Sequence, residues 1–83
     1  NVETLYQLVD EKVEALEFII RSVTRYTEVP LKNLTLKSNN LIACIARKRQ
    51  IIIPGGDDCM KPGDSVIVVT MDQRVEDIED ILM

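Results

Sequence analysis

The hydrophobic residues of this chain fall into short runs that polar turns separate. Residues 41–46, 51–53 and 66–69 are apolar at successive positions, which is typical of strands buried on both faces. Residues 13–20 instead alternate between a strongly apolar face and a more mixed one. Together the four segments predict a small sheet of about four strands.

The strand predicted at residues 41–46 decides where a binding surface could lie. The two-residue period of a strand places Leu41, Ala43 and Ile45 on one face. The same face then ends in the cation Arg47. A chain of 83 residues has few elements with which to cover both faces of such a strand. We therefore expect a second copy to cover one of them, in a symmetric homodimer.

Helical spacing or helix-start chemistry marks three further segments. The apolar positions of residues 2–9 recur at helical period, which predicts a short amphipathic helix. Residues 30–34 predict a one-turn helix, because proline suits a first helical position and Leu31 and Leu34 would project together. The chain should end in a helix that Asp72 caps. Its apolar stripe would consist of Val75, Ile78, Ile81 and Leu82.

Two connections between the predicted strands carry opposite turn signals. Lys61-Pro62-Gly63-Asp64 suits a type II turn, with proline at the second position and glycine at the third. Lys48-Arg49-Gln50 contains no glycine, so we expect a longer loop or a bulge there rather than a two-residue turn. The predicted fold class is α+β, a small mixed, mainly antiparallel sheet of about four strands with short helices.

Charge and composition argue against several classes of function. The net charge is −4, and the one basic cluster, Arg47-Lys48-Arg49, is too short for a nucleic-acid surface. No apolar run approaches the roughly 20 residues that a membrane helix needs, so direct membrane insertion is not expected. The chain has no histidine, the usual base of a catalytic triad, and we expect no enzyme activity.

The cysteines and the clustered aspartates have structural interpretations. Cys44 and Cys59 lack metal-ligand spacing, and as reduced thiols they favour a cytoplasmic protein. Asp57, Asp58 and Asp64 lie near two turns, where we expect them to be solvated. A calcium ion would need six or more oxygen ligands, so no metal site is predicted.

Five segments, taken in order, resemble one family. They are residues 13–18, 30–34, 41–47, 52–57 and 61–69. The set resembles the C-terminal regulatory domain of Trk-type potassium uptake proteins, called the RCK C-terminal or TrkA-C domain, and it spans nearly the whole chain. Two places depart from the family, which often has glycine at Val29 and within Lys48-Arg49-Gln50.

The resemblance implies that residues 1–83 form one RCK C-terminal domain. Residues 1–10 would be a linker helix from a nucleotide-binding domain that this sequence does not contain. The resemblance implies a cytoplasmic, non-catalytic regulatory module at the inner face of the cell membrane. Through the full-length protein, the module would act on a membrane potassium transporter subunit.

Some members of the family bind the effector cyclic di-AMP at a dimer interface, which suggests where a ligand would lie. The residues expected to contact it are Leu41, Ala43, Ile45, Arg47, Ile53 and Pro54. Arg47 would anchor a phosphate, and the alternative interpretation is a solvated charge at a strand end. Two alternatives stay open: a purely structural dimerisation domain, or an effector-binding domain of another cation transporter, such as a cation–proton antiporter.

Overall fold

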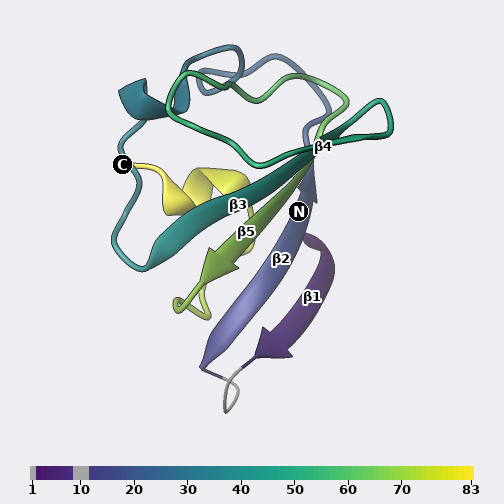
Figure 1. Ribbon diagram of the computed structural model, residues 1–83. Coiled ribbons are helices and arrows are strands. Elements are labelled where there is room, and N and C mark those ends of the chain that lie inside the picture. The colour runs from purple at the N-terminus through teal and green to yellow at the C-terminus, as the bar shows by residue number, and fades with distance from the viewer. Residues whose placement is uncertain (1, 9–11) are drawn as a thin grey trace.

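The fold is built on a single antiparallel sheet. The computed structural model describes residues 2–8 and 12–83 of the chain. Its strands lie in the order β1-β2-β5-β3-β4, and each pairs with its neighbour in antiparallel fashion (Figure 1). Their bounds are β1 Val2–Leu8, β2 Val13–Ile19, β3 Asn40–Arg47, β4 Gln50–Ile52 and β5 Ser65–Thr70. The predicted fold class is confirmed, with one strand more than the pattern indicated.

The additional strand is β1, where the sequence pattern predicted a helix. That prediction is wrong for Val2–Leu8, whereas residues 1, 9 and 10 of the predicted linker helix lie outside the described residues. β1 pairs along the free edge of β2, from Val2 opposite Phe18 to Leu8 opposite Val13. An isolated helix of this length is marginal in water, whereas a strand here pairs the backbone groups on one of its sides with those along the edge of β2.

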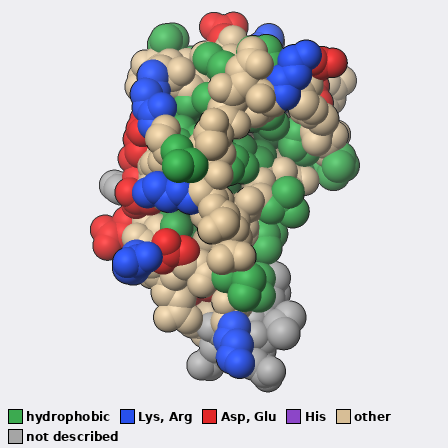
Figure 2. All heavy atoms as spheres, turned by 90° about the vertical axis from the view of Figure 1, so that its left-hand side faces the viewer, with side chains coloured by type: hydrophobic (Ala, Val, Ile, Leu, Met, Phe, Trp, Pro, Cys, Tyr) green, Lys and Arg blue, Asp and Glu red, His purple; other side chains and the backbone are tan. Residues whose placement is uncertain are grey.

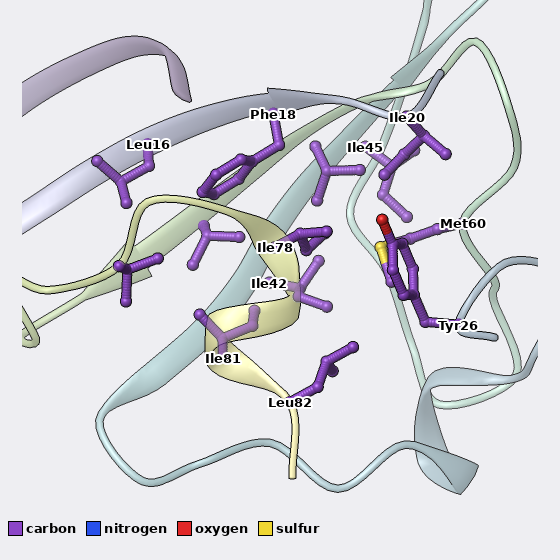
Figure 3. Close-up of a cluster of buried hydrophobic side chains, with 13 residues drawn as sticks. Leu16, Phe18, Ile20, Tyr26, Ile42, Ile45, Met60, Ile78, Ile81 and Leu82 are labelled. Atoms are coloured by element: carbon purple, nitrogen blue, oxygen red, sulfur yellow. The ribbon is translucent and has the colours of Figure 1, made fainter. Parts of the chain in front are cut away.

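One side of the sheet, the covered face, holds the core. It presents buried side chains from three strands, namely Leu16, Phe18, Ile42, Ile45, Val66 and Val68. A 3-10 helix, η2 (Ile78–Ile81), lies behind the sheet in Figure 1 and packs against them. Figure 3 shows Ile78 and Ile81 pointing from η2 toward Phe18 and Ile42. Tyr26 and Met60 close the core near Ile20.

A β-bulge in β3 overturns the predicted division of its two faces. The register of β3 against β5 shifts between Ile42 and Cys44, so Ala43 is an extra residue in the strand. As a result both Ile42 and Ile45 turn into the core, at 7% and 0% exposed. Ile45 therefore does not share a face with Leu41, which is 60% exposed.

The segment after Pro30 and the end of the chain were both predicted to be helical. Each contains a helix that is shorter than predicted. A 3-10 helix, η1, covers Leu31–Asn33 directly after Pro30, as predicted. At the end of the chain the four predicted apolar positions are all buried, but η2 is a single turn. Its cap is Asp77 in a capping box with Asp80, and not Asp72. Asp72 instead accepts hydrogen bonds from Arg74.

The two turn predictions had different outcomes. The type II turn is confirmed, because the backbone N–H of Asp64 donates to the carbonyl of Lys61 and Gly63 has a φ of 95°. The prediction for the β3–β4 connection is wrong. Arg47 pairs directly with Gln50, so Lys48 and Arg49 form a two-residue turn, with φ values of 49° and 67°. Pairing of the short strand β4 holds both residues in a conformation that glycine or asparagine would favour.

Candidate functional site

An apolar hollow opens between η1, the start of β3 and the loop that follows β4. Its volume is about 230 Å³. Figure 2 looks onto this side of the molecule and shows hydrophobic side chains exposed between polar ones. The lining residues are Leu31, Lys32, Leu34, Leu36, Leu41, Ile42, Pro54, Gly55 and Gly56. Most are aliphatic, so the hollow offers contact to a flat or apolar group, and Lys32 is the one charged residue that lines it.

The loop after β4 forms one wall because it binds the start of η1. The backbone N–H groups of Leu31 and Lys32 donate to the carbonyls of Asp58 and Gly56, at 2.8 and 2.9 Å. A Cβ at Gly56 would lie 3.1 Å from the Cβ of Lys32, so glycine permits this close approach. The loop is further held by Asp58, whose carboxylate accepts from the N–H of Gly55 at 2.7 Å.

Arg47 lies at the end of β3 and is bound within the chain. Its Nε and Nη2 each donate to the carboxylate of Asp64 at 2.8 Å, and Nη2 also donates to the carbonyl of Cys59 at 2.8 Å. Asp64 is 1% exposed, so the prediction that it is a solvated turn residue is wrong. The fork of the guanidinium matches the carboxylate in a bidentate pair that fastens the Lys61–Asp64 turn to β3.

The electrostatics of this pair favour the charged carboxylate. Burial alone would raise the pKa of Asp64, but the hydrogen bonds from Arg47 and from the backbone N–H of Lys61 lower the pKa below its ordinary value. Asp64 therefore stays ionised in the folded protein at neutral pH. The positive charge of Arg47 is largely balanced by Asp64, although the Arg47 side chain is still 25% exposed.

The six residues predicted to contact an effector do not all lie together. Leu41 and Pro54 line the hollow, and Ile53 precedes Pro54 with 76% of its side chain exposed. Ile45 is in the core, and Arg47 faces Asp64. Ala43 occupies the bulge.

Sequence reasoning did not place Lys32, Leu36 or the two glycines in a site. The signal that pointed toward the hollow was the joint projection of Leu31 and Leu34 from the one-turn helix. Both residues do line it. The remaining walls come from segments that are distant in the sequence.

The second notable surface is the side of the sheet opposite the core, which we call the open face. Strand alternation and register assign it the residues Thr4, Tyr6, Val13, Ala15, Glu17, Ile19, Leu41, Cys44, Ala46, Ile51, Ser65, Ile67 and Val69. None of these residues is buried. Figure 2 views the sheet from its side and shows hydrophobic side chains gathered along the right of the molecule.

Among the open-face residues, all of which the structure describes, Glu17 alone is charged. Its carboxylate accepts hydrogen bonds from the hydroxyls of Ser65 and Thr4, the latter at 2.9 Å. The hydrogen bond from Ser65, followed by that from Thr4, lowers the pKa of Glu17 below its ordinary value. Glu17 is therefore a stable anion on an otherwise uncharged surface.

Within residues 2–8 and 12–83, no helix has the length and hydropathy needed to cross a bilayer. The same residues contain no group of three or more acidic or cysteine side chains placed to hold a metal ion.

Comparison with curated proteins finds relatives of one kind. The chain is 33% identical over 70 residues to the Trk system potassium uptake protein TrkA homolog 2 of Methanosarcina mazei, covering 84% of this chain and 16% of that protein. It is 31% identical over 81 residues to the TrkA homolog of Archaeoglobus fulgidus, covering 98% of this chain and 18% of the relative. The predicted resemblance to the RCK C-terminal (TrkA-C) domain is confirmed.

A solved structure agrees with this TrkA-C assignment. A structure of an RCK domain with cda superposes with a TM-score of 0.60 at 25% sequence identity, covering 71% of this chain and 81% of that one. No family model matches the chain. The TrkA-C-like chain spans only 16% to 18% of the length of the two curated relatives.

Proposed function

We propose that this TrkA-C-like chain is a regulatory, non-catalytic domain of a Trk-type potassium uptake system. The observation that carries the proposal is its identity of 33% over 70 residues with a Trk system potassium uptake protein. The absence of histidine from the sequence removes the commonest general base and supports a role without catalysis. The domain would act in the cytoplasm, on a membrane transporter subunit, through the protein that contains it.

Regulation requires a domain with at least two arrangements to which an effector binds with different affinity. A homodimer supplies them, because a ligand that contacts both copies favours the relative position it fits better. The uncovered apolar side chains of the sheet support a dimer, since one chain leaves them in water.

The effector in this proposal is a small anion with flat rings, of the cyclic di-AMP kind, and it occupies the hollow. The aliphatic walls that Leu41 and Pro54 contribute suit a base, and Lys32 at the margin suits a phosphate. The ion pair of Lys32 with Asp57 is exposed and therefore weak, so a phosphate can replace it. The solved RCK domain with cda supports a ligand for this type of fold.

Arg47 is not among the residues that line the hollow, and its guanidinium is bound within the fold. Because its guanidinium binds the buried Asp64, replacing Arg47 would disturb the fold together with any ligand contact. A loss of binding in an Arg47 variant would therefore have two explanations. Lys32, whose side chain is exposed and whose ion pair is weak, gives the cleaner test.

The test is a calorimetric titration of the chain with cyclic di-AMP. Wild-type protein should bind, and Lys32→Gln should bind about tenfold or more weakly, because one charge-assisted contact is lost. Lys12→Gln removes the same charge from an exposed residue beside β2, away from the hollow, and should bind as wild type does. An absence of heat at high micromolar ligand would remove cyclic di-AMP from the proposal. Equal binding by all three proteins would move the site away from the hollow.

A further inference from the structure

We propose that the end of the sheet where β3 turns into β4 docks on an anionic lipid surface through three cations, Lys48, Arg49 and Lys61. We call these three side chains the basic tip. The inference rests on the proposed function, which places the domain in the cytoplasm beside a membrane transporter, and it adds the surface that the domain contacts. None of the three residues lines the hollow assigned to the effector.

The basic tip is assembled from two turns that are distant in the sequence. Lys48 and Arg49 form the turn between β3 and β4, which extends away from the rest of the chain in Figure 1. Lys61 begins the turn that leads into β5, and it lines a hollow of about 260 Å³ together with Lys48. Because Ala46 near the end of β3 pairs with Ser65 at the start of β5, both turns lie at the same end of the sheet.

The charges of the basic tip are not neutralised within the fold. Lys48, Arg49 and Lys61 are all exposed. Among the residues that the structure describes, none of the three forms an ion pair, whereas the neighbouring Arg47 is paired with Asp64. The tip therefore presents three positive charges to solvent, in a chain whose net charge is −4.

The backbone of the β3–β4 turn indicates that its two cations have a role outside the fold. Lys48 and Arg49 have φ values of 49° and 67°, in the left-handed region that glycine and asparagine adopt at lower cost. Strained residues of this kind are concentrated at positions that act on a ligand or partner. The pair that suits the turn best, Asn-Gly, would remove both charges. The fold alone thus gives no reason for two long cations here.

The acidic C-terminal segment lies away from the basic tip along β5. This strand begins next to the turn of Lys61 and ends at Thr70, and five of the fourteen acidic residues follow it in residues 72–80. The molecule is 33 Å long, whereas salt screens exposed charges beyond about 8 Å at physiological ionic strength. An anionic surface at the tip is therefore attracted by the three cations and only weakly repelled by the acidic segment.

The charge of the surroundings favours a lipid surface over the transporter itself. The cytoplasmic leaflet of a membrane is negative, whereas short cytoplasmic loops of membrane proteins carry an excess of Lys and Arg. The basic tip is therefore complementary to the leaflet and repels such loops. Pro62 and Gly63 beside Lys61 are exposed, and a Cβ at Gly63 would meet no atom within 4 Å, so the turn leaves the tip open to a flat surface.

Co-sedimentation of the chain with lipid vesicles tests the proposal. Vesicles of equal parts phosphatidylglycerol and phosphatidylcholine should bind the wild type roughly 100-fold more strongly than vesicles of phosphatidylcholine alone, because each cation near the surface contributes about fivefold. Raising the salt from about 0.1 M to about 1 M should remove most of this difference, since the attraction is screened. Equal binding to the two kinds of vesicle would overturn the proposal.

Two double variants of identical net charge locate the contact. Lys48→Asn with Arg49→Gly removes two cations from the tip and should bind the acidic vesicles about 25-fold more weakly, although its turn is less strained. Lys12→Gln with Lys37→Gln removes two exposed cations and should bind within about twofold of wild type. Lys12 and Lys37 precede β2 and β3, which begin near Thr70 at the other end of β5.

Thermal melts establish that the variants are folded. If the variant with the Asn-Gly turn does not fold, Lys61→Gln, which lies outside that turn, should bind the acidic vesicles about fivefold more weakly than wild type. An equal loss of binding in both double variants would show a response to net charge alone and would overturn the basic tip. Tighter binding to a short oligoglutamate peptide than to the acidic vesicles would replace the lipid surface by an acidic protein segment.

The proposed regulatory function is tested separately. Lys48→Asn with Arg49→Gly should bind cyclic di-AMP as the wild type does, because neither residue lines the hollow. A wild type that does not bind acidic vesicles but binds cyclic di-AMP would overturn the lipid contact and leave the proposed function standing. A wild type that binds the vesicles and not cyclic di-AMP would have the opposite meaning.

Discussion

The two faces of the sheet are made by the same strands, yet they are packed differently. On β5, Val66 and Val68 are 0% exposed under η2, whereas Ile67 and Val69 on the opposite side are only partly buried. Both sets are aliphatic, so hydrophobicity does not distinguish them. The difference arises because the chain supplies one covering layer, formed by η2 and the loops around Tyr26 and Met60. An apolar strand pattern thus shows that a surface is suited to burial. It does not identify the element that covers the surface.

The largest expected effect comes from adding a charge to each face of β3 in turn. Ile45→Asp puts a carboxylate in the core and should cost about 4 kcal/mol or more, which would abolish cooperative unfolding. Cys44→Asp adds the same group one residue earlier, on the open face, and should cost less than about 1 kcal/mol in the monomer. Thermal melts followed by circular dichroism of dilute protein measure both. Loss of structure in Cys44→Asp as well would show that the faces do not differ as described.

A smaller effect is expected where the covered face meets the Lys61–Asp64 turn. Arg47→Met leaves the carboxylate of Asp64 buried without its guanidinium and should cost about 3 kcal/mol at pH 7. The pKa of Asp64 is lowered in the folded state. Its contribution to stability is therefore present above the ordinary carboxyl pKa of about 4 and is lost as the pH falls through the folded pKa.

The difference in the free energy of unfolding between wild type and Arg47→Met should narrow as the pH falls, because the unpaired Asp64 of the variant protonates first. The difference should be smallest below the lowered pKa of Asp64 in wild type, where Asp64 is protonated in both proteins. Urea unfolding at pH 7 and at pH 3 measures it. A difference of the same size at both pH values would show that Arg47 stabilises the fold by packing rather than by its charge.

Substitutions in the cap of η2 test how much the cap contributes to the stability of the covering layer. The carboxylate of Asp80 accepts from the backbone N–H groups of Glu76 and Asp77, at 2.9 and 3.0 Å. Asp80→Ala should therefore cost about 1 kcal/mol in chemical denaturation. Glu79→Ala is the matched control, since it loses only an exposed ion pair with Arg25 and should cost less than about 0.5 kcal/mol. An equal loss of unfolding free energy in the two variants would mean that the cap does not stabilise the covering layer.

The smallest effect, with the opposite sign, is expected at the β3–β4 turn, outside both faces. Lys48 and Arg49 both have positive φ, a conformation that costs free energy for long side chains. Replacing the pair by Asn-Gly (Lys48→Asn with Arg49→Gly) should raise the free energy of unfolding by up to about 1 kcal/mol. Denaturant midpoints measure the change. A lower midpoint would indicate that the two original side chains make stabilising contacts in the folded chain.

Local chemistry along the chain predicted several elements correctly. The Lys61–Asp64 turn, the helical turn after Pro30 and the burial of Ile78 and Ile81 all follow from residues within a few positions of one another. The hollow was predictable only in part. Leu31 and Leu34 were expected to project together, but the loop that contains Pro54 joins them through hydrogen bonds between distant segments, and Leu41 is placed by the pairing of β3 with β5. The pairing of Arg47 with Asp64 spans 17 residues and leaves no local signal.

By itself, the sequence determined which segments are apolar, that a tight turn forms at Lys61–Asp64 and which family the chain resembles. Only the tertiary structure decided that Val2–Leu8 is a strand, because its hydrogen bonds are made to the edge of β2 and not within the segment. The bulge at Ala43 likewise depends on how β3 pairs with β5, and it turns Ile45 into the core. Which face of the sheet is covered depended on where η2 packs. A strand that is apolar on both sides does not specify this choice.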